Sequence, residues 1–176
     1  MATRYALNKT KYLLKPEVDR LEALLKTYQD REPRNILLLA LALKTGARAS
    51  ELLQLRTIDL NEYDQTVFVR GIKGSNDREI PLAPDLFGRL KRYSATSASV
   101  SELLFPIGYH RLHQIWEMYR PVPKKFHALR HTFAIQVYQK TKDIRLVQTA
   151  LGHRNIMNTM IYADYVYTQE EMKKIL

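Results

Sequence analysis

The sequence predicts a mainly helical domain that carries one small antiparallel β-sheet, an α+β fold. Helical patterns of apolar residues recur from Pro16 to the C-terminus, whereas the alternation typical of strands is confined to residues 57–82. The chain has 176 residues, of which 45% are hydrophobic, with only 6 Gly and 7 Pro. That length and apolar content suffice for one ordinary core. We therefore expect residues 1–176 to form a single domain.

The N-terminal third of the chain predicts three helices of different character. Pro16 suits a first helical position, and the apolar residues behind it recur at helical spacing until near Asp30. Residues 35–44 are apolar on every side and rich in Leu and Ala, which predicts a buried helix that ends at Gly46. A short helix with Ser50 as its N-cap is expected next.

The pattern changes to β-structure over residues 57–82. Residues 67–70 alternate valine with other side chains, and residues 71–77 are rich in turn formers. Residues 78–82 can return as a second strand, which completes a hairpin. Lys73 would then lie at or beside the tip of this hairpin.

The rest of the chain predicts further helices, separated by Pro and Gly residues. A stretch rich in Ser, Thr and Ala at residues 94–101 predicts a loop. The helical patterns lie at residues 84–93, 109–119, 127–138, 143–151, 155–163 and 168–175. The last of them is amphipathic, with its apolar side formed by Met172, Ile175 and Leu176.

The net charge of +10, from 28 Lys plus Arg against 18 Asp plus Glu, indicates a polyanionic partner. Basic and acidic residues are mixed along the chain, so this charge belongs to a folded surface rather than to a disordered tail. The absence of Cys excludes disulfides and thiolate metal sites. The longest apolar stretch, residues 36–43, is too short to cross a bilayer, and the N-terminus lacks the features of a signal peptide. We expect a soluble cytoplasmic protein.

Arg48 is the first polar residue in surroundings that predict burial, because it lies between the buried helix and the short helix that follows. A charge in such a place needs a partner. Taken alone, the segment leaves two interpretations open. Arg48 forms a structural ion pair with Glu51, or it is held there to bind an anion.

His127 and Arg130 lie three residues apart on one face of a predicted helix, where they could grip one small anion together. His127 and His131 also have the spacing of a helical metal pair. However, no Glu follows the first His, and no third ligand is evident. We therefore expect no metal at this position, and we interpret His131 as a packed structural histidine.

Tyr162 lies nine residues after His153, which itself follows the helix-ending Gly152. The chain has 11 Tyr, so rarity singles out none of them. Taken alone, Tyr162 is better interpreted as a core or interface aromatic, because most tyrosines have that role.

Together, these segments resemble the tyrosine recombinase family, which includes the phage integrases and the Xer-type recombinases and shares its catalytic chemistry with type IB topoisomerases. The family signature is T-G-x-R-x-S-E, a Lys in a β-turn, H-x-x-R followed by H-[TS]-F, L-G-H, and a Tyr nine residues after that His. Lys73-Gly-Ser resembles the turn best, although the hairpin also contains Arg70 and Arg78. In this sequence the signature residues are Arg48, Lys73, His127, Arg130, His153 and Tyr162.

The resemblance implies an enzyme that breaks and rejoins DNA strands, with Tyr162 as the nucleophile that attacks a backbone phosphate. It implies a 3′-phosphotyrosyl link and a free 5′-hydroxyl, with no requirement for ATP, a metal or another cofactor. Arg48 and Arg130 would hold the phosphate oxygens, since guanidinium groups bind them bidentately and stay charged. Lys73 would be the acid that protonates the leaving oxygen.

The resemblance also implies roles for three supporting groups. His127 would manage the proton of the tyrosine, and His153 would donate a hydrogen bond to the phosphate. Glu51 would orient Arg48 or the neighbouring histidines.

The implied partner is double-stranded DNA, bound by a homo-oligomer that forms a tetramer on the DNA. The family's additional N-terminal core-binding domain is expected to be absent, since the chain has no room for it. The tail at residues 168–176 either docks on a neighbouring protomer or packs back on its own domain. Candidate DNA contacts that flank the predicted catalytic segments are Lys124, Lys125 and Arg154.

The sequence leaves the biological reaction open among integration, excision, inversion and chromosome-dimer resolution. Two other classes also stay open: a relaxing enzyme similar to type IB topoisomerases, and a catalytically silent DNA-binding regulator. A catalytically silent regulator would not need all six polar residues of the family signature.

Overall fold

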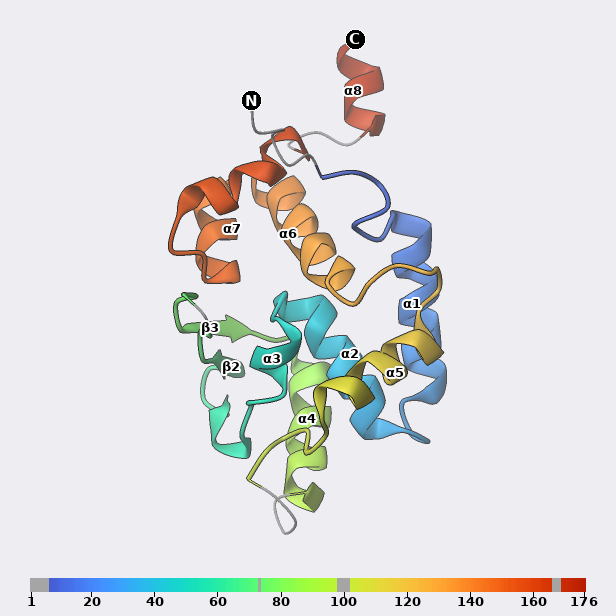
Figure 1. Ribbon diagram of the computed structural model, residues 1–176, viewed down its shortest axis with the longest axis vertical. Coiled ribbons are helices and arrows are strands. Elements are labelled where there is room, and N and C mark those ends of the chain that lie inside the picture. The colour runs from blue at the N-terminus through green and yellow to red at the C-terminus, as the bar shows by residue number, and fades with distance from the viewer. Residues whose placement is uncertain (1–6, 73, 98–101, 166–168) are drawn as a thin grey trace.

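A computed structural model describes residues 7–72, 74–97, 102–165 and 169–176 of the chain. Lys73 lies outside the described residues. The structure confirms a mainly helical fold with a small antiparallel sheet (Figure 1). In chain order its elements are α1 (Lys15–Tyr28), α2 (Pro33–Thr45), α3 (Ala49–Leu52), η1 (Thr57–Asp59), β1 (Leu60–Asn61), β2 (Thr66–Val69), β3 (Arg78–Pro81), α4 (Pro84–Ser97), α5 (Tyr109–Tyr119), α6 (Ala128–Thr141), α7 (Ile144–Leu151), η2 (Ile156–Asn158), η3 (Met160–Tyr165) and α8 (Gln169–Ile175).

The core is built around α2, whose residues from Ile36 to Leu43 are all buried. The helix contacts α1, α4 and α6, so it needs apolar side chains on every side. It ends at Gly46, which adopts a left-handed conformation with φ of 62° and donates its N–H to the carbonyl of Ala42. The prediction of a buried helix that ends at Gly46 is confirmed.

A second, smaller apolar cluster joins α6, α7 and η3. It contains Ala134 and Ile135 of α6, Val147 and Leu151 of α7, and the ring of Tyr162. Figure 1 shows these elements gathered at the end of the molecule opposite α4. Tyr162 is therefore part of a core, as expected for most tyrosines.

The sheet has the order β1-β2-β3, and both pairs of neighbouring strands are antiparallel. In the β2–β3 pair, Val67 lies opposite Ile80 and Val69 lies opposite Arg78. All four of these side chains are buried, whereas those between them in β2 and β3 are more exposed. The predicted hairpin is confirmed, and its inward face includes an arginine.

Two helix boundaries differ from those that the sequence predicts. Ser50 is not an N-cap, because α3 begins at Ala49 and the carboxylate of Glu51 accepts a hydrogen bond from the backbone N–H of Arg48 at 2.7 Å. Residues 94–97 continue α4 instead of forming a loop. The hydroxyls of Ser94 and Thr96 donate to backbone carbonyls three residues earlier, at 2.9 and 2.8 Å, which satisfies them inside a helix. Residues 98–101 lie outside the described residues.

The segment predicted as one helix at residues 155–163 consists of two 3₁₀-helices, η2 and η3. The side chain of Asn155 accepts a hydrogen bond from the backbone N–H of Met157 at 2.9 Å, which caps a single tight turn. The backbone turns again at Thr159, so a regular α-helix does not form.

The C-terminal helix α8 projects from the rest of the molecule (Figure 1). Its apolar residues Met172, Ile175 and Leu176 are 37%, 64% and 96% exposed. The ammonium group of Lys142 lies 3.5 Å from the carboxylate of Glu171, which links α8 to the end of α6. The described part of the chain does not cover the apolar side of this helix.

Candidate functional site

Glu51 is the buried anion around which the candidate site is organised. Its side chain is fully buried, and its carboxylate accepts two hydrogen bonds from Arg78, at 2.8 and 3.2 Å. It also lies 3.2 Å from a guanidinium nitrogen of Arg48 and 4.0 Å from one of Arg130. Burial acts to raise the pKa of Glu51, but the hydrogen bonds and charges of Arg78, Arg48 and Arg130 outweigh it and leave the pKa below its ordinary value.

Arg48 is the accessible member of this cluster, with 34% of its side chain exposed. Its guanidinium group donates to the carboxylate of Glu51 and to the hydroxyl of Ser75. The sequence left a choice between an ion pair with Glu51 and an anion-binding role. The structure shows the ion pair together with an exposed part that can take a further acceptor.

Arg130 is buried in α6 and joins the ends of two other helices. Its guanidinium group donates to the carbonyl of Gly46 at 2.6 Å and to the carbonyl of Leu151 at 2.8 Å. Burial, followed by repulsion from Arg48, lowers the pKa of Arg130 to about 9, although the charge of Glu51 acts in the opposite direction. The group therefore stays positively charged at neutral pH.

His127 occupies the N-cap position of α6, and its ring packs edge-on against that of His131, with 4.7 Å between the ring centroids. His127 keeps an exposed surface, but the protein atoms packed around its ring reduce its hydration and lower its pKa to about 4, and the charges of Arg130 and Arg48 add to this effect. At neutral pH the imidazole is uncharged, so it is able to accept a proton.

His131 is in direct contact with Tyr162. Its Nδ1 lies 2.8 Å from the phenolic oxygen, and both side chains are buried, with Tyr162 only 1% exposed. Burial, followed by the effect of His127, lowers the pKa of His131 to about 3, so the ring is neutral. The predicted internal packing of His131 agrees with its burial, but no sequence pattern predicts the contact with Tyr162.

His153 is held where the β2–β3 turn meets the end of α7. Its Nδ1 shares a hydrogen bond with the hydroxyl of Thr159 at 2.9 Å, and its backbone forms an isolated β-bridge with Ser75. Burial, followed by the charges of Arg130, Arg48 and Arg78, lowers the pKa of His153 to about 3.

Gly152 explains why the turn and α7 can approach so closely. It has φ of 70°, and a Cβ atom there would lie 2.6 Å from the carbonyl oxygen of Asn76. The backbone N–H of Asn76 donates to the carbonyl of Gly152 at 2.8 Å. Only a residue without a side chain fits this contact, which places the turn beside His153.

Arg78 is the site residue that sequence reasoning missed, having considered it only as a rival of Lys73. It is buried on the inward face of β3 and donates to the carbonyl of Ala150 at 2.8 Å as well as to Glu51. The signal that could have found it is the strand alternation that places Arg78 on the same face as Ile80. The other rival, Arg70, binds both carboxylate oxygens of Asp59 at 2.5 and 2.6 Å.

The candidate DNA contacts differ in how free their charges are. The ammonium group of Lys124 donates to the carbonyl of Tyr12 at 2.8 Å and to the carboxylate of Glu17 at 2.6 Å, so it is already bound within the domain. Lys125 and Arg154 are exposed.

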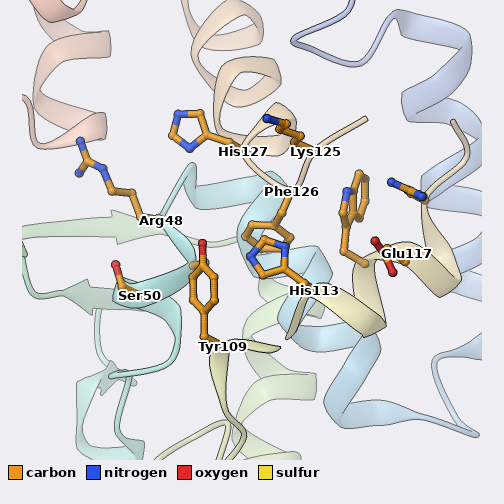
Figure 2. A pocket seen from close by; sticks show the side chains of 11 residues that line it. Arg48, Ser50, Tyr109, His113, Glu117, Lys125, Phe126 and His127 are labelled. Carbon is orange, nitrogen blue, oxygen red and sulfur yellow. The ribbon is translucent and has the colours of Figure 1, made fainter. Parts of the chain in front are cut away.

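A pocket of about 550 Å³ opens beside Arg48 and His127. Figure 2 shows these two side chains on one side, with Tyr109, His113 and Phe126 in the middle of the pocket. Within the described ranges, no group of three or more His, Cys, Asp or Glu residues is arranged to hold a metal ion. A helix of the length and apolarity needed to cross a membrane is also absent from the part of the chain that the structure describes.

The sequence of the chain matches the phage integrase family over residues 11–169. It is 34% identical over 142 residues to tyrosine recombinase XerA of Pyrococcus horikoshii, an overlap of 73% of this chain and 50% of that protein. It is 33% identical over 174 residues to a tyrosine recombinase of Pseudothermotoga lettingae, an overlap of 93% of this chain and 59% of that protein. The chain thus spans about half to three fifths of the length of these two relatives.

Solved structures of recombinases share the fold. The crystal structure of XerA recombinase superposes with a TM-score of 0.76 at 24% identity and covers 98% of this chain and 65% of that one. The catalytic domain of bacteriophage HP1 integrase gives a TM-score of 0.67 at 24% identity and covers 94% of both chains. These similarities confirm the predicted catalytic-domain fold.

Proposed function

The chain belongs to the phage integrase family, and from this membership we propose that it is the catalytic domain of a site-specific recombinase that breaks and rejoins DNA strands. The observation that supports the proposal most is the cluster around Glu51. Arg48, Arg78 and Arg130 surround one carboxylate, which leaves an excess of positive charge. A cluster of this kind suits one phosphate group of a DNA backbone.

In the proposed reaction, Arg48 and Arg130 bind the non-bridging oxygens of the scissile phosphate, and His153 donates a further hydrogen bond. Because the side chain of Arg130 is only 2% exposed, it reaches the phosphate after the same shift of η3 that Tyr162 requires. These groups stabilise the extra negative charge that develops on the oxygens at five-coordinate phosphorus. Glu51 and Arg78 do not touch the DNA but hold the two arginines in place. By analogy with an oxyanion-hole donor, removal of either phosphate-binding arginine should raise the barrier by about 3–4 kcal/mol.

Tyr162 attacks the phosphorus, so that a bond from the phenolic oxygen to phosphorus forms and the bond from phosphorus to the 5′-oxygen breaks. The leaving oxygen takes a proton from Lys73, in keeping with the family turn at that position, and the 5′-hydroxyl is released. The phosphotyrosyl ester keeps the bond energy, and attack by a 5′-hydroxyl reverses the step and rejoins the strand. This route consumes neither ATP nor a metal ion.

We propose that Tyr162 has two positions, one buried and one in which it reaches the DNA, and that its hydroxyl proton has a different acceptor in each. In the buried position its hydroxyl shares a hydrogen bond with the neutral ring of His131. Because a hydroxyl of a side chain that is 1% exposed cannot reach a DNA phosphate, η3 must shift when DNA binds. His127, which is neutral and adjacent to both His131 and the two arginines, then takes the proton.

DNA outside the catalytic cluster is bound through phosphates by Lys125 and Arg154. Lys124 takes no part in this binding, because the carboxylate of Glu17 already neutralises its charge. The exposed apolar side of α8 docks on a neighbouring protomer, as expected of a tetramer on DNA. Sedimentation with DNA tests this part, since truncation before residue 168 should abolish the higher species; an unchanged monomer with and without the tail contradicts it.

The main test uses DNA whose sequence is not fixed in advance. A library of nicked duplexes, randomised around the nick, allows the cleaved fragment to diffuse away and traps the covalent intermediate. Protein–DNA species that survive denaturation and carry a restricted set of sequences are the expected result. Adducts from every sequence, with relaxation of any supercoiled plasmid, would favour an enzyme similar to type IB topoisomerases, and no adduct at all would favour a silent regulator.

A further inference from the structure

The pocket beside the candidate catalytic residues extends well beyond the space that one phosphate needs. It begins at Arg48 and His127 and continues along α5 to Glu117, with a volume of about 550 Å³. In Figure 2, Glu117 lies on the side away from Arg48, whereas Lys125 lies beside His127. Only the first part of this space is used by the proposed reaction.

His113, in the middle of the pocket, has an unused polar atom. Its Nε2 is buried and has no hydrogen-bond partner among the described residues. A buried polar atom without a partner is unfavourable, so this nitrogen favours a ligand that brings a donor or an acceptor. Depending on the tautomer of the ring, Nε2 is able to serve either kind of group.

The walls around His113 are aromatic. Its ring centroid lies 4.5 Å from that of Tyr109 and 6.0 Å from that of Phe126. Tyr109 is 60% exposed, so much of its ring is available to a ligand, whereas Phe126 is buried and forms a fixed floor. Trp116 strengthens this floor, because its indole N–H donates to the carbonyl of Lys124 at 2.7 Å.

These features fit a nucleobase better than a second phosphate. Aromatic rings offer faces on which a base stacks, and a single polar group suits the edge of a base. The lining also holds Arg48, Arg120 and Lys125, which suit backbone phosphates on either side of a base, and Glu117, whose carboxylate is able to accept a hydrogen bond from a base amino group. The volume also exceeds what one phosphate would fill.

We infer that this pocket holds one unpaired nucleobase of the cleaved strand, beside the phosphate bound by Arg48, with Tyr109 as the stacking partner and His113 as the hydrogen-bonding group. The inference rests on the proposed function. Strand exchange between duplexes requires base pairs next to the break to open, and the pocket compensates for the stacking that an opened base loses.

The test compares three DNA duplexes of the same length: one fully paired, one with a single unpaired 2-aminopurine, and one with an abasic residue at that position. Stacking of one base strengthens binding by roughly 5- to 150-fold. We expect the 2-aminopurine duplex to bind at least about fivefold more tightly than the other two, with quenched fluorescence. Equal affinity for the abasic duplex would overturn the inference, because the backbone alone would then explain binding.

Substitutions assign the effect to the pocket. Tyr109→Leu and His113→Leu should each remove most of the preference for the unpaired base. Tyr63→Leu, a matched change of a tyrosine that is 94% exposed outside the pocket, should keep it. Because Tyr109 is on the surface, its variant should stay folded even if His113→Leu does not, and thermal melting checks this. If the preference survives both changes, the inference is wrong.

The covalent adduct separates this inference from the proposed function. Normal adduct formation without any base preference would contradict the pocket inference and leave the recombinase proposal standing. A base preference that depends on Tyr109, without an adduct on any DNA, would support the pocket and contradict the proposed reaction.

Discussion

Replacement of Glu51 by Gln should destabilise the domain strongly, although it changes only one functional group. The carboxylate accepts two hydrogen bonds from Arg78, one from the side chain of Arg48 and one from its backbone N–H. Gln keeps one acceptor oxygen, but its amide N–H groups face guanidinium donors. The buried Arg78 and Arg130 and the partly exposed Arg48 are then left without a counter-charge.

The size of the effect follows from the burial of Glu51 and Arg78, whose side chains are 0% and 3% exposed. Loss of one partner of a buried ion pair typically costs about 3–5 kcal/mol. For a domain of this size, a loss of about 4 kcal/mol lowers the Tm by roughly 10 °C. The same exchange at Glu22, whose ion pair with Lys44 is half exposed, should cost less than about 1 kcal/mol.

Urea unfolding at several pH values measures the difference. The pKa of Glu51 lies below its ordinary value in the fold, so the ionised group stabilises the fold above that ordinary value, and the contribution is lost as the pH falls through the folded pKa. The gap between the wild type and Glu51→Gln should therefore be largest at neutral pH and narrow below about pH 4. A gap no larger than that of Glu22→Gln at pH 7 would refute the reasoning.

Three further predictions concern other parts of the site. The pKa of His131 is about 3 in the fold against an ordinary 6.5, so the free energy of unfolding should fall as the pH drops below 6.5. His131→Gln should reduce the slope of the free energy of unfolding against pH by up to about 1.4 kcal/mol per pH unit. An unchanged slope in urea titrations contradicts this. Gly152→Ala places a Cβ atom at a φ of 70° and against the carbonyl of Asn76, so it should lower the free energy of unfolding by more than about 2 kcal/mol. Gly74→Ala has a φ of 83° but open space around the new Cβ atom, and should lower it by about 1 kcal/mol. Equal losses would contradict the contact between Gly152 and Asn76. Lys125→Ala should reduce the slope of log affinity for DNA against log salt by about 0.9, and Lys124→Ala should leave it unchanged; a similar reduction by both would show that Lys124 also binds phosphate.

The sequence predicted elements well where the pattern was long. The continuous apolar run of α2 predicts a buried helix, and the alternation in β2 predicts a strand. Each pattern extends over several residues, which leaves little room for another secondary structure. The predicted helix at residues 155–163 was wrong, since a short segment with a 3.6-residue pattern fits two 3₁₀ turns equally well. The predicted loop at residues 94–97 was also wrong, because Ser and Thr hydroxyls found backbone carbonyls within the helix.

The prediction of the candidate site from the sequence depended on the order of the motifs more than on any single residue. Arg48, Arg130 and Glu51 were identified from the sequence and lie together in the structure. The position of Arg78 and the contact between His131 and Tyr162 were not foreseen. Both depend on how β3, α6 and η3 pack, and no local pattern encodes the distance between residues that lie 27 or 31 positions apart.

The most direct test of the account identifies the amino acid that carries the DNA. Adducts trapped on nicked duplexes are digested with a protease and a nuclease, and the modified peptide is sequenced by mass spectrometry. We predict that the nucleotide is attached to Tyr162, that Tyr162→Phe forms no adduct, and that Tyr165→Phe, whose hydroxyl donates to the carbonyl of Leu7, still does. An adduct that persists in Tyr162→Phe, or that maps to Tyr165, would contradict the central claim.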